Sequence, residues 1–223
     1  TDRVLYLDGD MMCHGEVNEL FAIDVDVNCV ASVSTDRNAK RQCHRLGTQN
    51  YFNSGMMLFH TQHWHAQHML DKVIEKMNWC KKNLDHKGHV RGWNGLYYQD
   101  QNVLNYVCDG HLTWLSKKFN YLYVLDRHAF YKKQFVNDDY KKQVILHFAG
   151  YTKPWYAWAA SYEVIKEYNE LKKQSPWKDA PMIEPKGKKQ YHQAARTALF
   201  FGEITTCLSY YKKYWLNKLH LTR

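Results

Sequence analysis

Short apolar runs recur along the first 150 residues, and other segments separate them. The apolar runs cover residues 3–7, 29–33, 56–59 and 144–146. Nearly continuous runs of this kind are typical of strands buried on both faces, so the run at 3–7 predicts a buried strand. The predicted helices cover residues 61–83, 100–110 and 155–173. Because strands and helices alternate, we expect an α/β domain whose sheet is covered on both faces.

Residues with strong local preferences mark several expected boundaries. Thr61 and Asp100 are residue types that cap helices, so each is expected to begin the helix that follows it. The Asn-Ser-Gly segment at 53–55 is typical of a turn, and we expect one ahead of the strand at 56–59.

The chain changes character toward its C-terminus. Three of its four prolines lie within 176–185, which indicates a linker and divides the chain into residues 1–174 and an extension, 175–223. In the extension, residues 189–221 predict one long helix with an aromatic and aliphatic stripe. Residues 173–223 hold ten basic and three acidic residues, so most of the net charge of +9 belongs to this end.

Composition excludes several classes of protein. Apolar residues make up 45% and charged residues 24% of the chain, which is typical of a globular protein and not of a disordered one. No run of about 18 apolar residues is present, so a membrane-spanning helix is not expected. None of the six cysteines lies in a C-x-x-C pair, and we expect reduced thiols in a cytosolic protein.

Two acidic residues follow the first apolar run. Asp8 and Asp10 flank Gly9 at the carboxyl end of the strand at 3–7, where open α/β sheets bind their ligands. Paired carboxylates can share a hard divalent cation, and a glycine between them lets a phosphate approach the backbone closely. The pair is therefore a candidate cation site.

His147 ends the apolar run at 144–146 and begins the sequence His-Phe-Ala-Gly-Tyr-Thr-Lys-Pro-Trp. An imidazole beside two carboxylates favours Mn²⁺ over Mg²⁺, because nitrogen donors prefer transition metals. Gly150 allows a tight turn in this segment. Lys153 stands before a stiff proline and is able to reach a phosphate.

Amide and carboxylate side chains stand at two further boundaries. Asn53 lies in the expected turn, and Asp100 and Gln101 lie at the expected start of a helix. Such side chains can bind sugar hydroxyls. Equally, Asn53 can form a turn and Asp100 can cap a helix, so the residues alone leave both interpretations open.

Four segments occur in one order along the chain, at residues 3–10, 51–58, 100–105 and 147–155. They read Arg-Val-Leu-Tyr-Leu-Asp-Gly-Asp, Tyr-Phe-Asn-Ser-Gly-Met-Met-Leu, Asp-Gln-Asn-Val-Leu-Asn and His-Phe-Ala-Gly-Tyr-Thr-Lys-Pro-Trp. This set resembles glycosyltransferase family 8, and the tail resembles the C-terminal extension of its lipopolysaccharide core glucosyl- and galactosyltransferases. The resemblance implies an α/β GT-A fold, a UDP-hexose donor, Mn²⁺ (or Mg²⁺) as cofactor, and retaining transfer to the lipopolysaccharide core.

The resemblance also implies roles for particular residues. The implied positions are Asp8, Asp10 and His147 for the metal, Gly150 and Lys153 for the diphosphate, Asn53 and Asp36 for the sugars, and Asp100 and Gln101 for catalysis. We expect a front-face mechanism, in which the acceptor hydroxyl enters beside the departing UDP. A metal ion and Lys153 would then offset the charge of the leaving group.

Members of this family carry further residues before the Asp-x-Asp motif, including the first βα units. We therefore expect this chain to be the C-terminal portion of a longer enzyme and to be weakly active alone. The implied location is cytoplasmic and peripheral to the inner membrane, with residues 190–223 against anionic lipid. In the alternative interpretation, the C-terminal helix packs on the domain as a structural part.

Two other functions compete with the transferase. A haloacid-dehalogenase-type phosphatase also places Asp8 and Asp10 after an early strand, with the acidic residues at 138–139 as its later pair, but it requires Thr or Val where this chain has Met12. A non-enzymatic polyanion-binding protein would explain the basic tail. No nucleic-acid-binding motif supports it, so nucleic acid is not an expected partner.

Overall fold

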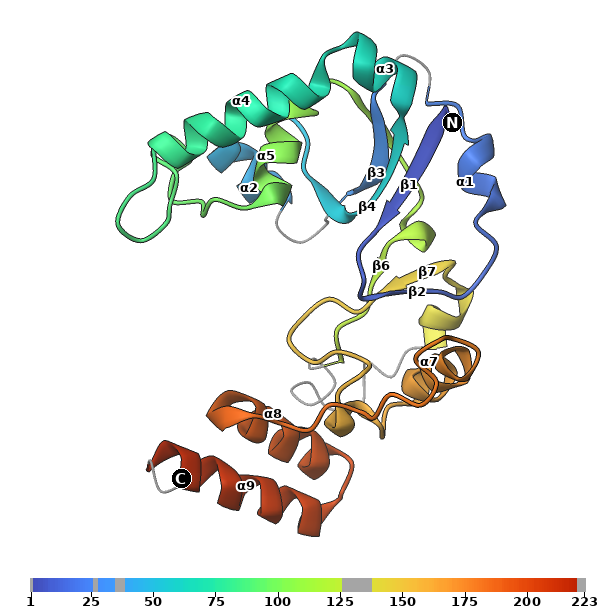
Figure 1. Ribbon diagram of the computed structural model, residues 1–223, viewed down its shortest axis with the longest axis vertical. Helices are drawn as coiled ribbons and strands as arrows, with labels where there is room; N and C mark the ends of the chain where they lie inside the picture. Colours follow the sequence, from blue (N-terminus) through green and yellow to red (C-terminus); the bar gives the residue numbers. More distant parts are fainter. Residues whose placement is uncertain (1, 26–27, 35–38, 126–137, 220–223) are drawn as a thin grey trace. The chain divides into compact units, whose positions relative to one another are not determined.

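The computed structural model describes residues 2–25, 28–34, 39–125 and 138–219 (Figure 1). The chain forms two compact units and passes between them more than once. The first unit comprises Thr1–Gly9, Cys13–Tyr121 and Gln143–Ile145, and the second comprises Asp10–Met12, Leu122–Lys142 and Leu146–Arg223. The boundary expected at residue 174 stays a prediction.

The first unit is built on a four-stranded sheet with the order β1-β4-β3-β5. Its strands are β1 (Arg3–Leu7), β3 (Val30–Ser34), β4 (Phe52–His60) and β5 (Leu112–Trp114). β4 pairs antiparallel with β1 and β3, whereas β3 and β5 run parallel. The three strands predicted in this part of the sequence are therefore confirmed, within a mixed sheet.

The burial expected for β1 is wrong. Among the described residues, β1 lies at an edge of the sheet, next to β4. Val4 and Tyr6 are 45% and 46% exposed, so one face of the strand is open. The reason is positional, because an edge strand has a neighbour on one side alone and can keep alternate side chains exposed even when its sequence is apolar throughout.

The turn expected at residues 53–55 is also wrong, because this segment lies inside β4. The register between β3 and β4 jumps there: Ser32 pairs with Met57, but Ser34 pairs with Phe52. The extra β4 residues form a bulge, which we call the Asn-Ser-Gly bulge. The Ser32 hydroxyl stabilises it by contacting the carbonyl oxygens at positions 53 (3.1 Å) and 56 (2.7 Å).

Five α-helices and one 3₁₀ helix of the first unit are described. They are α1 (Asn18–Ala22), α2 (Ala39–Leu46), α3 (Thr61–Ala66), α4 (Met69–Lys82), α5 (Asp100–Val107) and η1 (Lys117–Phe119). The helix predicted over 61–83 is divided in two at His68, whose φ is 50°. The caps are each one residue earlier than expected: His60 caps α3, with its side chain accepting from the His63 amide, and Gln99 precedes α5.

Helices α4 and α5 lie side by side in the first unit and enclose part of its core (Figure 1). The buried residues of this cluster are Leu46, Tyr51, Cys80, Val90, Trp93, Leu96 and Val103. A second cluster lies between the sheet and the same helices, and it includes Val30, Phe52, Met57 and Met69. These contacts fix the N-terminal end of α5 against the start of β4.

The second unit is mainly helical. Its helices are η2 (Asp138–Lys142), η3 (Ala157–Ala159), α7 (Glu163–Lys173), α8 (Gly187–Phe200) and α9 (Ile204–Lys218). A three-stranded sheet with the order β2-β7-β6 contains β2 (Met11–Cys13), β6 (Tyr121–Leu122) and β7 (Ile145–His147), of which Cys13, Tyr121 and Ile145 are assigned to the first unit and the rest to the second. The predicted strand at 144–146 is confirmed as β7, displaced by one residue.

Two helix predictions in this unit are wrong. The helix expected from residue 155 begins only at Glu163, because turns and η3 occupy the preceding segment. The helix expected over 189–221 is a hairpin of two helices, α8 and α9. Gly202 lies between them with φ 75°, a left-handed conformation that glycine adopts easily and that ends a helix.

Two findings concern features that composition bears on. All six cysteines are free. No helix in the described ranges combines the length and the apolar character needed to cross a bilayer.

Replacing Gly202 with alanine is expected to destabilise the α8–α9 hairpin. Nothing lies within 4 Å of the added Cβ, so the penalty comes from the backbone alone. The left-handed conformation costs an alanine about 1 kcal/mol. Gly15→Ala is the matched control, because Gly15 has no positive φ and its Cβ would meet Val144 at an ordinary 3.7 Å. Urea unfolding of both variants measures the difference, and equal stabilities would contradict the expectation.

Candidate active site

Asp10 and His147 come together in the second unit. His147 ends β7, and Asp10 directly precedes β2, the neighbouring strand. The Phe148 amide donates to the Asp10 carbonyl over 2.9 Å, which ties the two segments together. Asp10 Oδ1 lies 3.3 Å from His147 Nε2, and the His147 side chain is only 7% exposed.

Lys153 completes this cluster. Its Nζ donates to Asp10 Oδ2 over 2.5 Å and to the Phe148 carbonyl over 2.8 Å. Gly150 lies in the connecting loop with φ 107°, a conformation that favours glycine. Of the residues that the sequence predicted, His147 and Lys153 both contact Asp10, and Gly150 lies in the loop between His147 and Lys153.

Asp8 belongs to the first unit, but only Gly9 separates it from Asp10. Its amide donates to the Gly55 carbonyl over 2.8 Å, and its Oδ1 accepts from the Tyr6 hydroxyl over 2.8 Å. Asp8, Asp10 and His147 form the candidate metal-ligand group among the described residues.

The donor set fits a divalent transition metal. Carboxylate oxygens and an imidazole nitrogen are ligands of Mn²⁺ and similar ions. Two ligands at right angles on one ion, each bonded at about 2.1 Å, lie about 3 Å apart. The 3.3 Å between Asp10 Oδ1 and His147 Nε2 matches this spacing.

A second group of predicted residues comes together in the first unit. Gln101, in the first turn of α5, faces the Asn-Ser-Gly bulge. Its Oε1 accepts from the Ser54 amide (3.2 Å) and from Asn53 Nδ2 (3.4 Å). Asn120 Nδ2 in turn donates to Asn53 Oδ1 over 2.9 Å. The amide side chains at 53 and 101 thus share one polar site.

Asp100 lies beside this group and is exposed. Its Oδ1 accepts from the Gln101 amide over 2.8 Å, so the carboxylate satisfies a free N–H at the start of α5. The structure therefore gives Asp100 a helix-terminal contact, one of the two roles left open by the sequence. Asp36 lies outside the described residues.

Four residues of this site were missed by sequence reasoning. They are Tyr51, Asn102, Asn105 and Asn120. Asn102 and Asn105 are 2% and 1% exposed, although both are polar residues of a short helix. The signal was available, because two asparagines three positions apart lie on one face of a helix.

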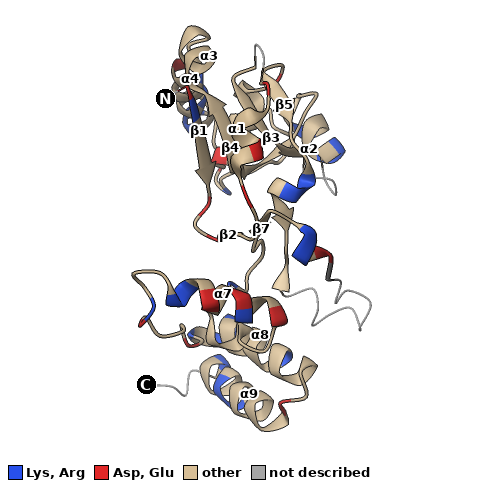
Figure 2. Ribbon diagram, turned by 90° about the vertical axis from the view of Figure 1, so that its right-hand side faces the viewer, with Lys and Arg blue, Asp and Glu red and all other residues tan. Residues whose placement is uncertain are grey.

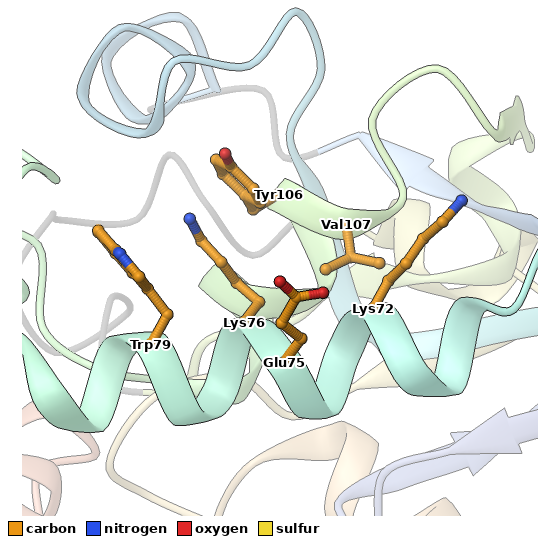
Figure 3. A pocket seen from close by; sticks show the side chains of 6 residues that line it. All are labelled: Lys72, Glu75, Lys76, Trp79, Tyr106 and Val107. Carbon is orange, nitrogen blue, oxygen red and sulfur yellow. The ribbon is translucent and has the colours of Figure 1, made fainter.

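The structure also has a pocket of about 350 Å³ between α4 and α5, apart from the predicted residues (Figure 3). Its lining residues are Lys72, Glu75, Lys76, Trp79, Tyr106 and Val107. The Lys76 ammonium lies 3.5 Å from the centroid of the Tyr106 ring and 3.9 Å from that of Trp79. These cation–π contacts hold Lys76 in place and join the two helices.

Comparison with known proteins identifies the family. The model of glycosyl transferase family 8 matches residues 1–159, and that of its C-terminal region matches residues 162–218. The chain therefore belongs to glycosyltransferase family 8. Two solved structures with the GT-A fold resemble it. The galactosyltransferase LgtC, in complex with donor and acceptor sugar analogues, matches with a TM-score of 0.58 and 19% identity, over 80% of this chain and 65% of that chain. The bifunctional glycosyltransferase WbbM matches with a TM-score of 0.59 and 17% identity, over 80% of this chain and 34% of that chain.

Lipopolysaccharide glycosyltransferases are among its relatives. The chain is 30% identical to the lipopolysaccharide glucosyltransferase WaaO of Escherichia coli, over 97% of this chain and 62% of that protein. It is also 30% identical to a lipopolysaccharide 1,3-galactosyltransferase of Salmonella typhimurium, over 98% of this chain and 63% of that protein. The chain thus spans less than two thirds of the length of these relatives. The matches favour the transferase over the phosphatase and polyanion-binding alternatives.

Asn105→Ala is expected to lower the free energy of unfolding by about 2–3 kcal/mol. The Asn105 side chain accepts from the Phe52 amide (2.6 Å) and donates to the Phe52 carbonyl (2.9 Å), and the substitution leaves both buried groups without these bonds. Chemical denaturation measures the change. Asn18→Ala, at an exposed position of α1, is the control and should change stability by less than about 0.5 kcal/mol.

Proposed function

We propose that the chain is the catalytic part of a retaining hexosyltransferase that moves glucose or galactose from a UDP-sugar to the lipopolysaccharide core. The observation that carries the proposal is the cluster of Asp10, His147 and Lys153 within a family 8 chain. It puts an imidazole and an ammonium group around one carboxylate. A cation and a positive side chain can both offset the charge of a diphosphate.

Asp8, Asp10 and His147 are proposed to hold the cation, Mn²⁺ or, less suited to imidazole, Mg²⁺. When bound, the ion would neutralise charge on the diphosphate of the donor. Lys153 is proposed to bind the same diphosphate and to offset the charge of the departing UDP, with Gly150 letting the backbone approach.

The polar site at the Asn-Ser-Gly bulge is proposed to bind the donor sugar. Asn53 and Gln101 offer amide groups, and Asp100 offers a carboxylate at the start of α5. Asp36 remains a proposed contact of the sugar or the acceptor. An amide is a poor nucleophile, so we favour the front-face mechanism, in which the acceptor hydroxyl enters beside the departing UDP.

Relatives support the proposed acceptor. WaaO and the Salmonella enzyme are named for lipopolysaccharide, so its core oligosaccharide is the proposed acceptor. The proposed location is the cytoplasmic face of the inner membrane, and the composition of the C-terminal hairpin supports it. Helices α8 and α9 contain six Lys or Arg and no Asp or Glu (Figure 2). Exposed apolar residues on and next to them are Leu199, Ile204, Leu208, Trp215 and Leu219. Basic and apolar groups on one hairpin suit an anionic membrane surface.

UDP binding should depend on Mn²⁺ and on Asp10. In isothermal titrations of the whole chain, Mn²⁺ is expected to raise the affinity for UDP by about tenfold or more, since one charge-assisted contact supplies roughly 1.4 kcal/mol. Asp10→Asn should abolish this increase, and Lys153→Met should weaken UDP binding in the presence of Mn²⁺.

Asp71→Asn is the matched control for these titrations, because Asp71 is an exposed carboxylate of α4. Its UDP affinity should equal that of the wild type with and without Mn²⁺. If Asp10→Asn and the wild type respond to Mn²⁺ alike, the proposed metal site is contradicted.

Membrane contact is tested with substitutions in α9, because deleting residues 190–223 would also remove buried Ala194, Ala195 and Ala198. Leu208→Ser combined with Trp215→Ser should reduce sedimentation with anionic vesicles several-fold, because two apolar side chains no longer insert. The matched change is Leu171→Ser, at an exposed position of α7. Equal binding of the three proteins would refute the proposed contact.

A further inference from the structure

A chain of hydrogen bonds leads from Gln101 into the interior of the first unit. Gln101 Nε2 donates to the Tyr51 hydroxyl over 3.0 Å, and this hydroxyl donates to Asn102 Oδ1 over 2.6 Å. Asn102 Nδ2 donates to the Tyr97 carbonyl over 2.9 Å. At the other end, Gln101 Oε1 accepts from the Ser54 amide over 3.2 Å. We call these contacts the Tyr51 relay.

Both ends of the Tyr51 relay are backbone groups, and this fixes the direction of every bond in it. The Ser54 N–H can only donate, so the atom of Gln101 that faces it is the oxygen. The Tyr97 carbonyl can only accept, so the Asn102 nitrogen faces it. The Tyr51 hydroxyl has one hydrogen, which it gives to Asn102, and it therefore accepts from Gln101. One set of amide orientations satisfies all four bonds.

The reversed orientation of the Gln101 amide is unfavourable. Its oxygen would meet the oxygen of Tyr51, whose hydrogen is already donated, and its nitrogen would meet the Ser54 N–H. Tyr51 and Asn102 are 4% and 2% exposed, so water does not replace the lost partners cheaply. A tyrosine hydroxyl is protonated at neutral pH, and burial raises the pKa of Tyr51 further above that range, so its hydrogen is available to the relay.

We propose that Tyr51 is a positioning residue of the donor-sugar site, which keeps the Gln101 amide oxygen turned toward the Asn-Ser-Gly bulge. The role in sugar binding rests on the proposed function, whereas the orientation of the amide rests on the hydrogen bonds alone. Tyr51 is buried and acts on a ligand only through Gln101. A free Gln101 amide would divide its time between two orientations, and one of them offers the sugar a donor in place of an acceptor.

Tyr51→Phe removes the hydroxyl and keeps the ring in its hydrophobic cluster. The first measurement is ¹⁵N NMR of side-chain amides, with the Gln101 signals assigned by their loss in Gln101→Ala. We expect the Nε2 hydrogens of Gln101 to exchange with water about tenfold faster in Tyr51→Phe, the factor that corresponds to a lost hydrogen bond of about 1.4 kcal/mol. Asn102→Ala, which removes the next member of the relay, should act in the same direction.

Tyr98→Phe is the matched control. Tyr98 packs against the same hydrophobic cluster as Tyr51, and within the described part of the chain its hydroxyl makes no hydrogen bond. Its replacement should leave the exchange of the Gln101 amide unchanged. Similar acceleration in Tyr98→Phe and Tyr51→Phe would indicate a general loosening of the cluster and overturn the proposal.

A double-mutant cycle separates positioning from a merely structural effect. In the presence of Mn²⁺, the affinity for UDP-glucose and UDP-galactose is compared with that for UDP in the wild type, Tyr51→Phe, Gln101→Ala and the double variant. Tyr51→Phe should weaken binding of at least one UDP-hexose about fivefold and leave UDP binding unchanged. With Gln101→Ala already present, Tyr51→Phe should add no further loss.

The outcomes distinguish the positioning role from the proposed function. An unchanged Gln101 amide in Tyr51→Phe, or a loss of sugar affinity that persists undiminished in the Gln101→Ala background, overturns the proposal. If the wild type binds neither UDP nor a UDP-hexose, the proposed function fails instead. The exchange rates of the Gln101 amide then decide alone whether the Tyr51 relay orients it.

Discussion

The contact between Asn105 and the start of β4 is the interaction on which the first unit depends. The buried Asn105 side chain binds both the amide and the carbonyl of Phe52, and its Nδ2 also donates to the Gln101 carbonyl over 2.8 Å. One amide therefore locks α5 to β4 at the place where the bulge begins. Because the bulge and Gln101 share this anchor, the polar site between them is held by the core and not by loop residues alone.

In the second unit, the Asp10 carboxylate and the Lys153 ammonium are partly buried, and each has a partner of opposite charge. The Asp10 carboxylate contacts an imidazole through one oxygen and the Lys153 ammonium through the other. A buried carboxylate without such partners would be strongly destabilising. The same pairing makes the cluster chemically suited to a cation and a phosphate, so stability and proposed function use the same atoms.

Local patterns predicted the positions of elements well and their ends poorly. The strands at β3, β4 and β7 follow from apolar runs, since a run of this kind needs burial wherever the chain places it. The break of the first long helix at His68 and the turn at Gly202 were not predicted, because helical spacing of apolar residues continues across both positions. In each case a residue with a positive φ, His68 or Gly202, interrupts the helix.

The sequence by itself determined the family and the GT-A fold, because four motifs occur in one order along the chain, and it selected candidate site residues, namely Asp8, Asp10, His147, Lys153, Asn53 and Gln101. Only the tertiary structure decided the contacts among them. Hydrogen bonds between Tyr51, Asn102 and Gln101 join residues of a strand end and a helix start that are about 50 positions apart. No local pattern encodes such pairing, since it depends on how α5 packs against β4.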